Sequence, residues 1–354
     1  MILPKHPLNK IARISHPIKS REGAVTLERN ERTTDFSDDV LEDLRNLITG
    51  FALRAYPEMD EAYDALAAWS GHPVEELLFT DGADGALSRI WATYVAPGDE
   101  VVTITPSYAM YPVYCEMFDA KMTALGFDEN LNLSLQTILE AVTSETRLLA
   151  LVNPNQPIEC IFTLDELRLL ADHCRNHDVL FLVDEAYFHF CKITAEPLVR
   201  SHDNVIVART MSKAFGLAGL RIGYLMAQQN LIGALRALKP IYEINGLNAA
   251  IATYFLKRPE IMEEYVDAVN SGREVLSAFF RDHNCSLHGQ HSNTILAGLP
   301  PTVSAVSVTE ALRSEGWLIR AETNPPTSNH LRITLGPPDQ MQGLCALLAL
   351  HLEN

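Results

Sequence analysis

The sequence lacks the cysteine patterns that indicate a metal site or a disulfide framework. Its six cysteines are scattered, with no CxxC pair and no Cys/His spacing typical of zinc ligands. We therefore expect reduced thiols in a protein core and no bound metal. The chain also has no apolar stretch approaching the ~18 residues of a membrane span, and residues 1–7 contain no continuous apolar segment like that of a signal peptide. These absences predict a cytoplasmic protein that does not insert into membranes.

Positive charge is also scarce. Lys and Arg total 28 against 45 Asp and Glu, which gives a formal net charge of -17. Binding to a polyanion needs clustered Lys and Arg, so this balance argues against nucleic acid and against an anionic membrane surface as partners. The chain has no internal repeats or low-complexity tracts, and the turn after the first predicted strand, residues 81–85, does not fit the GxGxxG pattern. An NAD-dependent enzyme or another nucleotide-binding α/β protein is therefore not favoured.

What is present is the composition of a soluble globular protein, with 47% hydrophobic and 21% charged residues. A chain of 354 residues exceeds a single ordinary core and predicts two domains, or one large α/β unit with a satellite. Strand–loop–helix alternation over about 75–240 predicts a mainly parallel sheet with helices on both faces and chemistry at the strand ends. A long helix follows over about 248–279, with a possible break at Arg258-Pro259, and then a smaller α/β portion.

One lysine lies in an unusual setting, within the stretch from Thr210 to Tyr224. A predicted strand ends at Thr210 and Ser212, whose hydroxyls can hydrogen-bond a phosphate, and the glycines that follow let backbone pass close to a bound ring. Lys213 stands between these hydroxyls and Arg221. An amine that is partly desolvated and near a cation has a lowered pKa and can form a Schiff base with an aldehyde. A bare Ser-Lys pair is more often part of a surface loop, so the prediction depends on the length of the whole pattern.

A carboxylate follows the apolar run Val179–Val183. Such a group is costly to bury unless it meets a cation, and a protonated pyridine nitrogen is such a cation. Asp184 is therefore a candidate to keep a pyridine ring charged. The alternative, an aspartate that accepts a hydrogen bond from a loop or helix N–H, is common at strand ends.

Two further segments could hold a phosphorylated aromatic cofactor. Gly82, Ala83 and Asp84 open a predicted helix, where free backbone N–H groups and the positive end of the dipole form a natural phosphate seat. Many helices that bind nothing begin in the same way. Tyr108 lies just beyond the predicted strand over 100–105, where an aromatic side chain can stack on a heteroaromatic ring.

Two arginines near the end of the chain lie within strand patterns, Arg320 after Gly316-Trp317 and Arg332 in the string LRITLG. An arginine in a strand is usually a solvated surface residue. Two in adjacent strands suit an anionic substrate better, because the planar guanidinium can bind a carboxylate or phosphate with two hydrogen bonds.

Taken together, the stretch Thr210–Tyr224, the DEAY string at 184–187 and LRITLG at 331–336 resemble the pyridoxal phosphate (PLP)-dependent aminotransferases of fold type I. The likeness is greatest to the histidinol-phosphate aminotransferase group and extends from Asn30 to Gly336. It implies an α/β fold with a mainly parallel, seven-stranded-type sheet in a large domain and a smaller α/β domain. It also implies PLP as cofactor, amino acid and oxo acid substrates, and a homodimer with shared active sites. We assign residues 1–46 to an N-terminal arm with part of the small domain. Residues 47–248 form the large PLP-binding domain, and residues 249–354 form the C-terminal small domain in this assignment.

The resemblance implies roles in catalysis and cofactor binding. Lys213 would carry the cofactor and move a proton between the substrate's α carbon and the cofactor's C4′, and Asp184 would keep the pyridine nitrogen protonated. Tyr187 would bind the ring oxygen, and Tyr108 would stack on the ring. Tyr56 of the partner subunit would contact the phosphate. Within the same subunit the phosphate would be held by Gly82, Ala83, Asp84, Thr210, Ser212 and Arg221.

It also implies substrate-binding residues. Arg332 would bind the carboxylate of glutamate or 2-oxoglutarate, and Arg320 corresponds to the second arginine of the group. Asn30 lies in the sequence Asn30-Glu31-Arg32, which resembles an arm that folds over the active site in the family.

One loop departs from the family pattern. Relatives usually have NPNNPTG where this chain has Asn153 to Glu159, so Gln156 replaces the asparagine that donates to the cofactor's ring oxygen and Ile158-Glu159 replaces Thr-Gly. Glutamine keeps the amide but adds a methylene group. Either Gln156 or a shifted Asn155 could be the donor.

The predicted function is a PLP-dependent aminotransferase that acts between an amino acid or amino-phosphate substrate and 2-oxoglutarate or glutamate. The alternative is a PLP-dependent decarboxylase, as in threonine-phosphate decarboxylase, or a transaminase of another phosphorylated or aromatic amino acid in a specialised pathway. Family members share these residues and differ in loops. A non-catalytic protein of the same fold is disfavoured because Lys213, Asp184 and Arg332 are all present.

Overall fold

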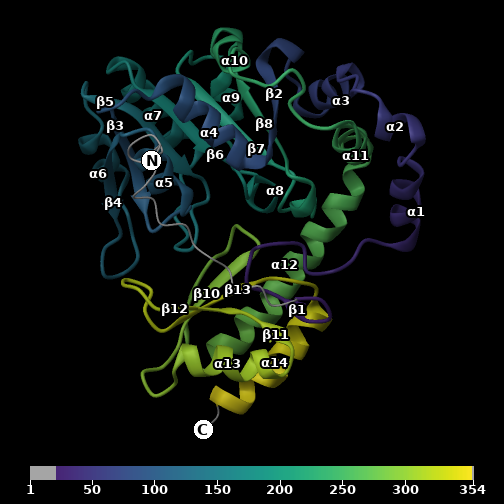
Figure 1. Cartoon of the computed structure of the whole chain (residues 1–354). Helices are drawn as coiled ribbons and strands as arrows, with labels where there is room; N and C mark the ends of the chain where they lie inside the picture. The colour runs from purple at the N-terminus through teal and green to yellow at the C-terminus, as the bar shows by residue number, and fades with distance from the viewer. Residues whose placement is uncertain (1–20, 353–354) are drawn as a thin grey trace, which may run out of the picture.

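The computed structural model describes residues 21–352, which form a large α/β part and a smaller α/β part (Figure 1). Residues 1–20 of the predicted N-terminal arm and residues 353–354 of the predicted small domain lie outside the described residues. Among the residues described, no helix is both long enough and apolar enough to cross a membrane.

The strands are β1 (Val25–Thr26), β2 (Leu77–Asp81), β3 (Glu100–Thr105), β4 (Lys121–Gly126), β5 (Thr146–Val152), β6 (Leu180–Asp184), β7 (Val205–Thr210), β8 (Ile222–Ala227), β9 (Ser286–His288), β10 (Thr294–Gly298), β11 (Trp317–Leu318), β12 (Arg320–Glu322) and β13 (His330–Thr334). The α-helices are α1 (Asp38–Asn46), α2 (Gly50–Arg54), α3 (Asp60–Ser70), α4 (Gly82–Tyr94), α5 (Met110–Met117), α6 (Leu135–Ala141), α7 (Leu164–Asn176), α8 (Phe188–Cys191), α9 (Glu196–Val199), α10 (Gln229–Arg236), α11 (Gly246–Leu256), α12 (Pro259–Asp282), α13 (Ala305–Ser314) and α14 (Pro338–Leu352). Short 3-10 turns are η2 (Val74–Glu76) and η3 (Ala218–Leu220).

The large part is built on a seven-stranded sheet in the order β2-β8-β7-β6-β5-β3-β4. Every neighbouring pair is parallel except those that β8 forms with β2 and β7. All residues of β6, β7 and β8 are buried. Since successive side chains of a strand point to opposite faces, this burial shows that both faces of the sheet are covered, and helices such as α4, α7 and α9 pack against it. The predicted fold class is confirmed.

The smaller part contains the antiparallel sheet β12-β13-β10-β9 and the helices α13 and α14. The chain's N-terminal segment also lies here, because β1 pairs in parallel with β11. The long helix expected after residue 248 is divided into α11 and α12, and the predicted break at Arg258-Pro259 is confirmed. Proline lacks a backbone N–H and therefore suits the first turn of α12. The domain boundaries at residues 46 and 248 stay a proposal.

Candidate active site

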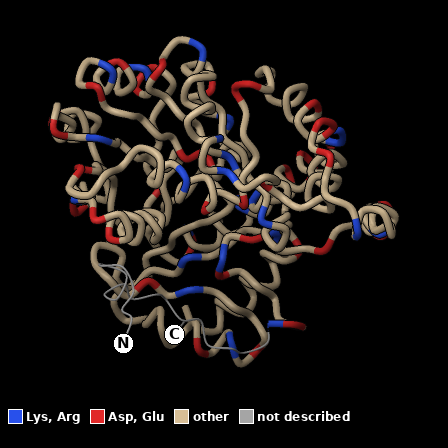
Figure 2. The backbone as a smooth tube through the Cα atoms, turned by 45° about the horizontal axis from the view of Figure 1, so that its top comes forward, with Lys and Arg blue, Asp and Glu red and all other residues tan. Residues whose placement is uncertain are grey.

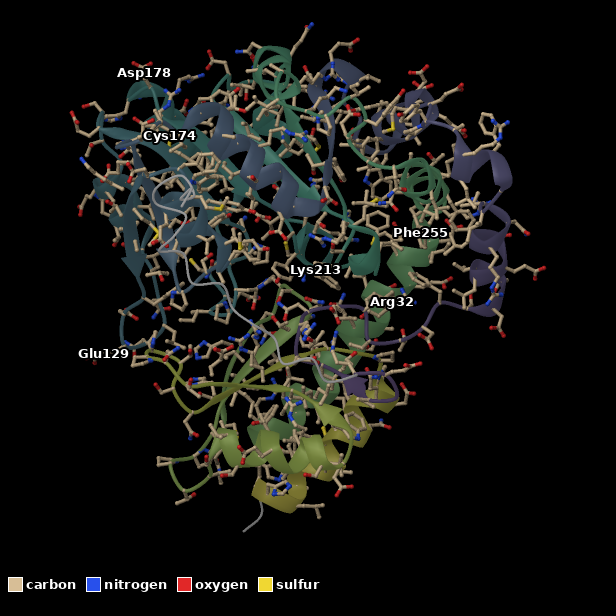
Figure 3. All side chains as sticks on the ribbon, in the orientation of Figure 1. Arg32, Glu129, Cys174, Asp178, Lys213 and Phe255 are labelled. Carbon is tan, nitrogen blue, oxygen red and sulfur yellow. The ribbon has the colours of Figure 1, made fainter. Side chains whose placement is uncertain are left out.

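A cavity of about 390 Å³ lies where the carboxyl ends of the parallel strands face the smaller part. Figure 3 places Lys213 at this junction. Figure 2 shows basic and acidic residues together in the middle of the molecule, with further acidic residues on the outer helices. The volume is within the range of small-molecule sites. Most of the predicted site residues line this cavity. They are Asn30, Ala83, Asp84, Tyr108, Gln156, Asp184, Tyr187, Thr210, Ser212, Lys213, Arg221, Arg320 and Arg332. Gly82, Asn155 and Tyr56 are not in the lining.

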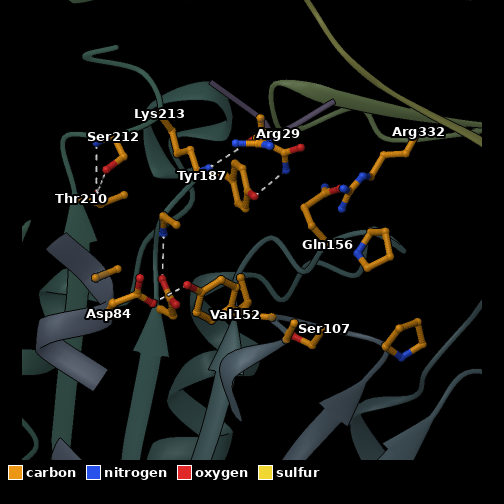
Figure 4. A pocket seen from close by; sticks show the side chains of 18 of the residues that line it. Arg29, Asp84, Ser107, Val152, Gln156, Tyr187, Thr210, Ser212, Lys213 and Arg332 are labelled. Atoms are coloured by element: carbon orange, nitrogen blue, oxygen red, sulfur yellow. Dashed lines mark hydrogen bonds between the residues drawn. The ribbon is translucent and has the colours of Figure 1, made fainter. Parts of the chain in front are cut away.

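Lys213 follows β7 by one short turn and reaches into the cavity (Figure 4). Its Nζ lies 3.5 Å from the backbone oxygen of Arg29, to which it donates a hydrogen bond. The pKa of Lys213 is lowered to about 8, mainly because burial disfavours the charged amine. Glu31 opposes the shift, whereas Arg332 and Arg221 add to it. A substantial neutral fraction of this amine is therefore present at slightly alkaline pH.

The beginning of α4 forms an anion seat with the turn after β7. Gly82 has a φ of 68°, and a Cβ added there would lie 2.7 Å from Nη2 of Arg221, so the guanidinium packs directly on the glycine. Arg221 also lies 3.2 Å from the carboxylate of Asp84 and donates to Ser212 Oγ at 3.4 Å. The hydroxyl of Thr210 donates to Ser212 Oγ at 3.0 Å. A cation, two hydroxyls and a helix N-terminus thus converge, as in phosphate sites.

Asp184 ends β6 and is buried, with 3% of its surface exposed. Its carboxylate accepts hydrogen bonds from the backbone N of Ala186 at 3.1 Å and from the hydroxyl of Tyr111 at 3.4 Å, both neutral groups. Burial raises the pKa of Asp184 to about 7, and the neighbouring charge of Asp84 adds to this shift. The loop N–H contact considered as the alternative is therefore present, yet it does not compensate for the burial. A cationic group in the cavity would stabilise the ionised carboxylate.

Asn30 connects the N-terminal segment to the cavity. Its side-chain amide donates to the hydroxyl of Tyr187 at 2.8 Å, and its backbone N donates to Oγ1 of Thr334 at 2.9 Å. The backbone oxygen of Asn30 accepts from Nδ2 of Asn293 at 3.1 Å. The residue is thus anchored to the smaller part while its side chain orients a tyrosine of the large part.

Both candidate amides of the unusual loop are bound within the protein. Nδ2 of Asn155 donates to the backbone oxygens of Pro106 and Ile158, at 3.1 and 2.9 Å. Gln156 does line the cavity, but its Nε2 donates to Ser292 Oγ at 2.8 Å and its Oε1 accepts from Thr294 Oγ1 at 2.7 Å. A donor role of either residue toward a ring oxygen stays a prediction. Both N–H groups of the Asn155 amide are already used, whereas Gln156 uses one of its two N–H groups on Ser292.

Tyr108 lines the cavity from the large part, and the two predicted arginines line it from the smaller part. Tyr108 is 38% exposed, and its hydroxyl donates to the carboxylate of Asp84. Arg320 and Arg332 are direct partners in the pairing of β12 with β13. Both approach one carboxylate oxygen of Glu322, at 3.2 and 3.4 Å. The arginine pair therefore has an internal counter-ion within the cavity.

Comparison with known proteins identifies the family. The family model for class I and II aminotransferases matches residues 23–348. The chain belongs to this family. A histidinol-phosphate aminotransferase from Caldanaerobacter subterraneus subsp. tengcongensis is 26% identical over 317 residues, covering 88% of this chain and 89% of the relative.

Solved structures show the same fold. The histidinol-phosphate aminotransferase from Sinorhizobium meliloti in complex with pyridoxal-5'-phosphate has a TM-score of 0.83 and 24% identity, with 93% of this chain and 91% of that chain covered. L-threonine-O-3-phosphate decarboxylase from Porphyromonas gingivalis has a TM-score of 0.78 and 25% identity, with 93% and 100% covered. The protein is a PLP-dependent aminotransferase of fold type I that acts on small molecules.

The cavity of this aminotransferase fits PLP. Asp184 offers a buried carboxylate to the pyridine nitrogen, and the seat at Gly82 and Arg221 offers a cation and a helix N-terminus to the phosphate. Ser107 Oγ is a buried atom of the lining, and the described part of the chain gives it no hydrogen-bond partner. A polar group of a bound cofactor would satisfy it.

Sequence reasoning missed three polar lining residues of this aminotransferase, Arg29, Ser107 and Glu322. Glu322 could have been found, because a residue two positions after Arg320 on a strand lies on the same face. Arg29 directly precedes Asn30, and Ser107 directly precedes Tyr108, so both adjoin residues that were predicted.

Tyr56 of the aminotransferase lies away from the cavity of its own chain. It is 80% exposed and stacks on Tyr242, with ring centroids 5.0 Å apart and planes at 14°. Nearby, Phe51 in α2 and Ile241 beside Tyr242 are 60% and 83% exposed. Several large apolar side chains are therefore exposed around Tyr56.

Proposed function

We propose that this aminotransferase transfers the amino group of an anionic donor, with histidinol phosphate as the first candidate, to 2-oxoglutarate. The observation that carries the proposal is the convergence of Lys213, Asp184 and Arg332 on one cavity, from the turn after β7, from β6 and from β13. The candidate donor comes from the names of relatives such as the enzyme of Caldanaerobacter subterraneus. Two arginines in the lining suit the carboxylate of glutamate or the phosphate of an amino-phosphate.

Bound PLP would supply an aldehyde and an electron sink for the negative charge that develops at the substrate's α carbon. We propose that Lys213 attaches the cofactor through its amine and that the amino group of the substrate then replaces it on the cofactor. The Lys213 amine released in this exchange, in its neutral form, would take the proton from the α carbon and return it at the cofactor's C4′. Asp184 keeps the pyridine nitrogen protonated. Tyr187, oriented by Asn30, binds the ring oxygen.

The remaining site residues hold the cofactor and the substrate in place. In our proposal Arg221, Thr210 and Ser212 bind the phosphate together with the backbone of Gly82, Ala83 and Asp84, and Tyr108 stacks on the ring. Arg332 binds the substrate carboxylate, and Arg320 lies beside it as the second cation. Each of these groups positions the α carbon close to Lys213, which lowers the entropic part of the barrier.

We also propose a homodimer in the cytoplasm, with active sites shared between subunits. The exposed surface of Phe51, Tyr56 and Ile241 supports it, because a contiguous apolar surface commonly marks an interface. Tyr56 would then approach the phosphate seat of the other subunit. All six cysteines are free, as expected for a reducing compartment.

The test is a visible absorption spectrum of the purified protein, recorded with L-glutamate, L-histidinol phosphate and aromatic amino acids in turn. A band that disappears with one donor and returns with 2-oxoglutarate is expected, and the donor that acts names the substrate class. Lys213→Ala should remove the band of the lysine-bound cofactor and reduce turnover by roughly 10³-fold or more. A band that survives this substitution would contradict the role of Lys213. Release of carbon dioxide from a donor without oxo acid would indicate the decarboxylase alternative.

A further inference from the structure

The positions at which the loop 153–159 departs from the family pattern share a structural property. Gln156, Ile158 and Glu159 belong to the large part, and each contacts the segment 290–296 of the smaller part, which leads into and includes most of β10. The side-chain hydrogen bonds of Gln156 and Glu159 go to residues 290–294 and not to the anion seat or to Asp184. The three residues that differ from the family pattern therefore all contact the same segment, 290–296.

Gln156 joins the two parts through both ends of its amide. The nitrogen donates to Ser292 Oγ at 2.8 Å, and the oxygen accepts from Thr294 Oγ1 at 2.7 Å. The three side chains are buried, at 8%, 0% and 1% exposure. A buried hydrogen bond is costly to break because its partners are left unsatisfied. An asparagine is one methylene shorter and could not reach both hydroxyls from the same backbone position.

Glu159 is the charged residue among the three, and it contacts Gln290 and His291 of the smaller part. Its carboxylate accepts from the backbone N of Gln290 at 2.9 and 3.0 Å and from the backbone N of His291 at 2.7 Å, and it lies 2.9 Å from Nδ1 of His291. Hydrogen bonds to an ionised acceptor are stronger than neutral ones. The glycine expected here in relatives has no side chain and could make none of these contacts.

Ile158 adds an apolar contact. It is fully buried and forms a separate small core with Leu131 of the large part and Leu296 of β10, and Phe127 packs against this core. Leu296 is the direct pairing partner of Arg332 in the antiparallel ladder between β10 and β13. The loop is thus connected to the proposed carboxylate-binding arginine through a single strand.

We propose that Gln156, Ile158 and Glu159 form a domain anchor that fixes β10, and through it Arg332, at a set position relative to Lys213 before substrate binds. They are positioning residues, and Gln156 does not donate to the cofactor's ring oxygen. The inference rests on the proposed function for the role of Arg332. Binding is tighter when the receptor is already ordered, so the anchor lowers the cost of binding a dicarboxylate.

The test compares Gln156→Asn and Glu159→Gln in the PLP-bound protein with the native protein. The exposed Glu145→Gln in the loop before β5 is the control, because its side chain has no part in the anchor. We expect both anchor variants to increase the rate of deuterium exchange in peptides covering 290–296 by roughly tenfold. The dissociation constant of succinate, an unreactive dicarboxylate, should rise roughly five- to tenfold in both. The kcat of Glu159→Gln, whose side chain lies outside the cavity lining, should stay within about twofold of the native value.

A second pair of measurements separates the anchor from a cofactor role. Ser292→Ala removes one partner of Gln156 without touching the cavity lining, and its effect on exchange should not add to that of Gln156→Asn. Unchanged exchange and succinate binding in both anchor variants would overturn the proposal. A shift in the pH titration of the visible band in Gln156→Asn alone would instead place Gln156 at the ring oxygen. If the native protein showed no PLP band, the proposed function would fail, whereas the exchange measurements would still test the anchor.

Discussion

At the scale of single residues, the buried carboxylate of Asp184 has the clearest energetic consequence. Its pKa of about 7 in the folded protein exceeds the usual value of 3.8, so the folded state without cofactor binds a proton more tightly than the unfolded state. The contribution of Asp184 to the stability of the cofactor-free protein therefore falls as pH rises from about 4 to about 7 and changes no further above it. A protonated pyridine nitrogen would remove this penalty by supplying the missing positive charge.

Replacing this carboxylate by an amide should reveal the penalty. In the cofactor-free protein, Asp184→Asn should increase the free energy of unfolding more at pH 8 than at pH 5, by about 2 kcal/mol, because the native carboxylate is ionised at the higher pH. Urea unfolding at both pH values, at equal protein concentration, measures the difference. An equal effect at the two pH values would show that the carboxylate does not titrate between them. Turnover of the PLP-bound variant should fall by several orders of magnitude.

The counter-ion Glu322 leads to a prediction about substrate binding. Its carboxylate lies 3.2 and 3.4 Å from the two arginines and offsets part of their charge. Glu322→Gln should therefore tighten succinate binding, roughly three- to tenfold at low salt, with a smaller gain at high salt because ions screen the added attraction. Titration calorimetry measures the affinity. Weaker binding would mean instead that Glu322 is needed to orient Arg332.

At the scale of elements, the sequence predicted the strands and helix ends that are determined by residues close together in the chain. Continuous apolar runs predicted the buried strands such as β5 and β6, and Pro259 marked the division between α11 and α12. The partners of Gln156 could not be predicted, because its contacts with Ser292 and Thr294 span more than a hundred positions and depend on how two sheets meet. Glu322 was not predicted, because a glutamate close to an arginine also occurs commonly on strands whose side chains face solvent.

The first turn of α4 gives a prediction at this scale. Gly82→Ala places a methyl group 2.7 Å from Arg221 Nη2 at a backbone φ of 68°, so the guanidinium must move and the backbone is strained. The affinity for PLP should fall roughly tenfold or more, as measured by fluorescence titration of the cofactor-free protein. Gly219→Ala is the matched control, since a Cβ there meets no atom within 4 Å. Equal affinities of the two variants would contradict the phosphate seat.

At the scale of the whole molecule, the proposed shared sites can be tested by mixing two inactive or weakened variants. Lys213→Ala lacks the amine, and Tyr56→Ala lacks the side chain that would reach the other subunit. A mixed dimer would contain one intact site, so unfolding and refolding an equimolar mixture should restore roughly a quarter of the native activity. Activity equal to the mean of the two separate variants would show that Tyr56 serves no neighbouring site.

The arm that carries Asn30 has a consequence for how the protein is synthesised. Asn30 is held by Asn293 and Thr334, and β1 pairs with β11, so its partners leave the ribosome long after the arm itself. All seven strands of the large sheet, the last ending at Ala227, emerge before any of these partners. During translation, β1 and Asn30 therefore have none of these partners until after every strand of the large sheet has been made. A ribosome that stops between residues 227 and 334 releases a chain that contains every strand of the large sheet but lacks Thr334, which holds the backbone of Asn30.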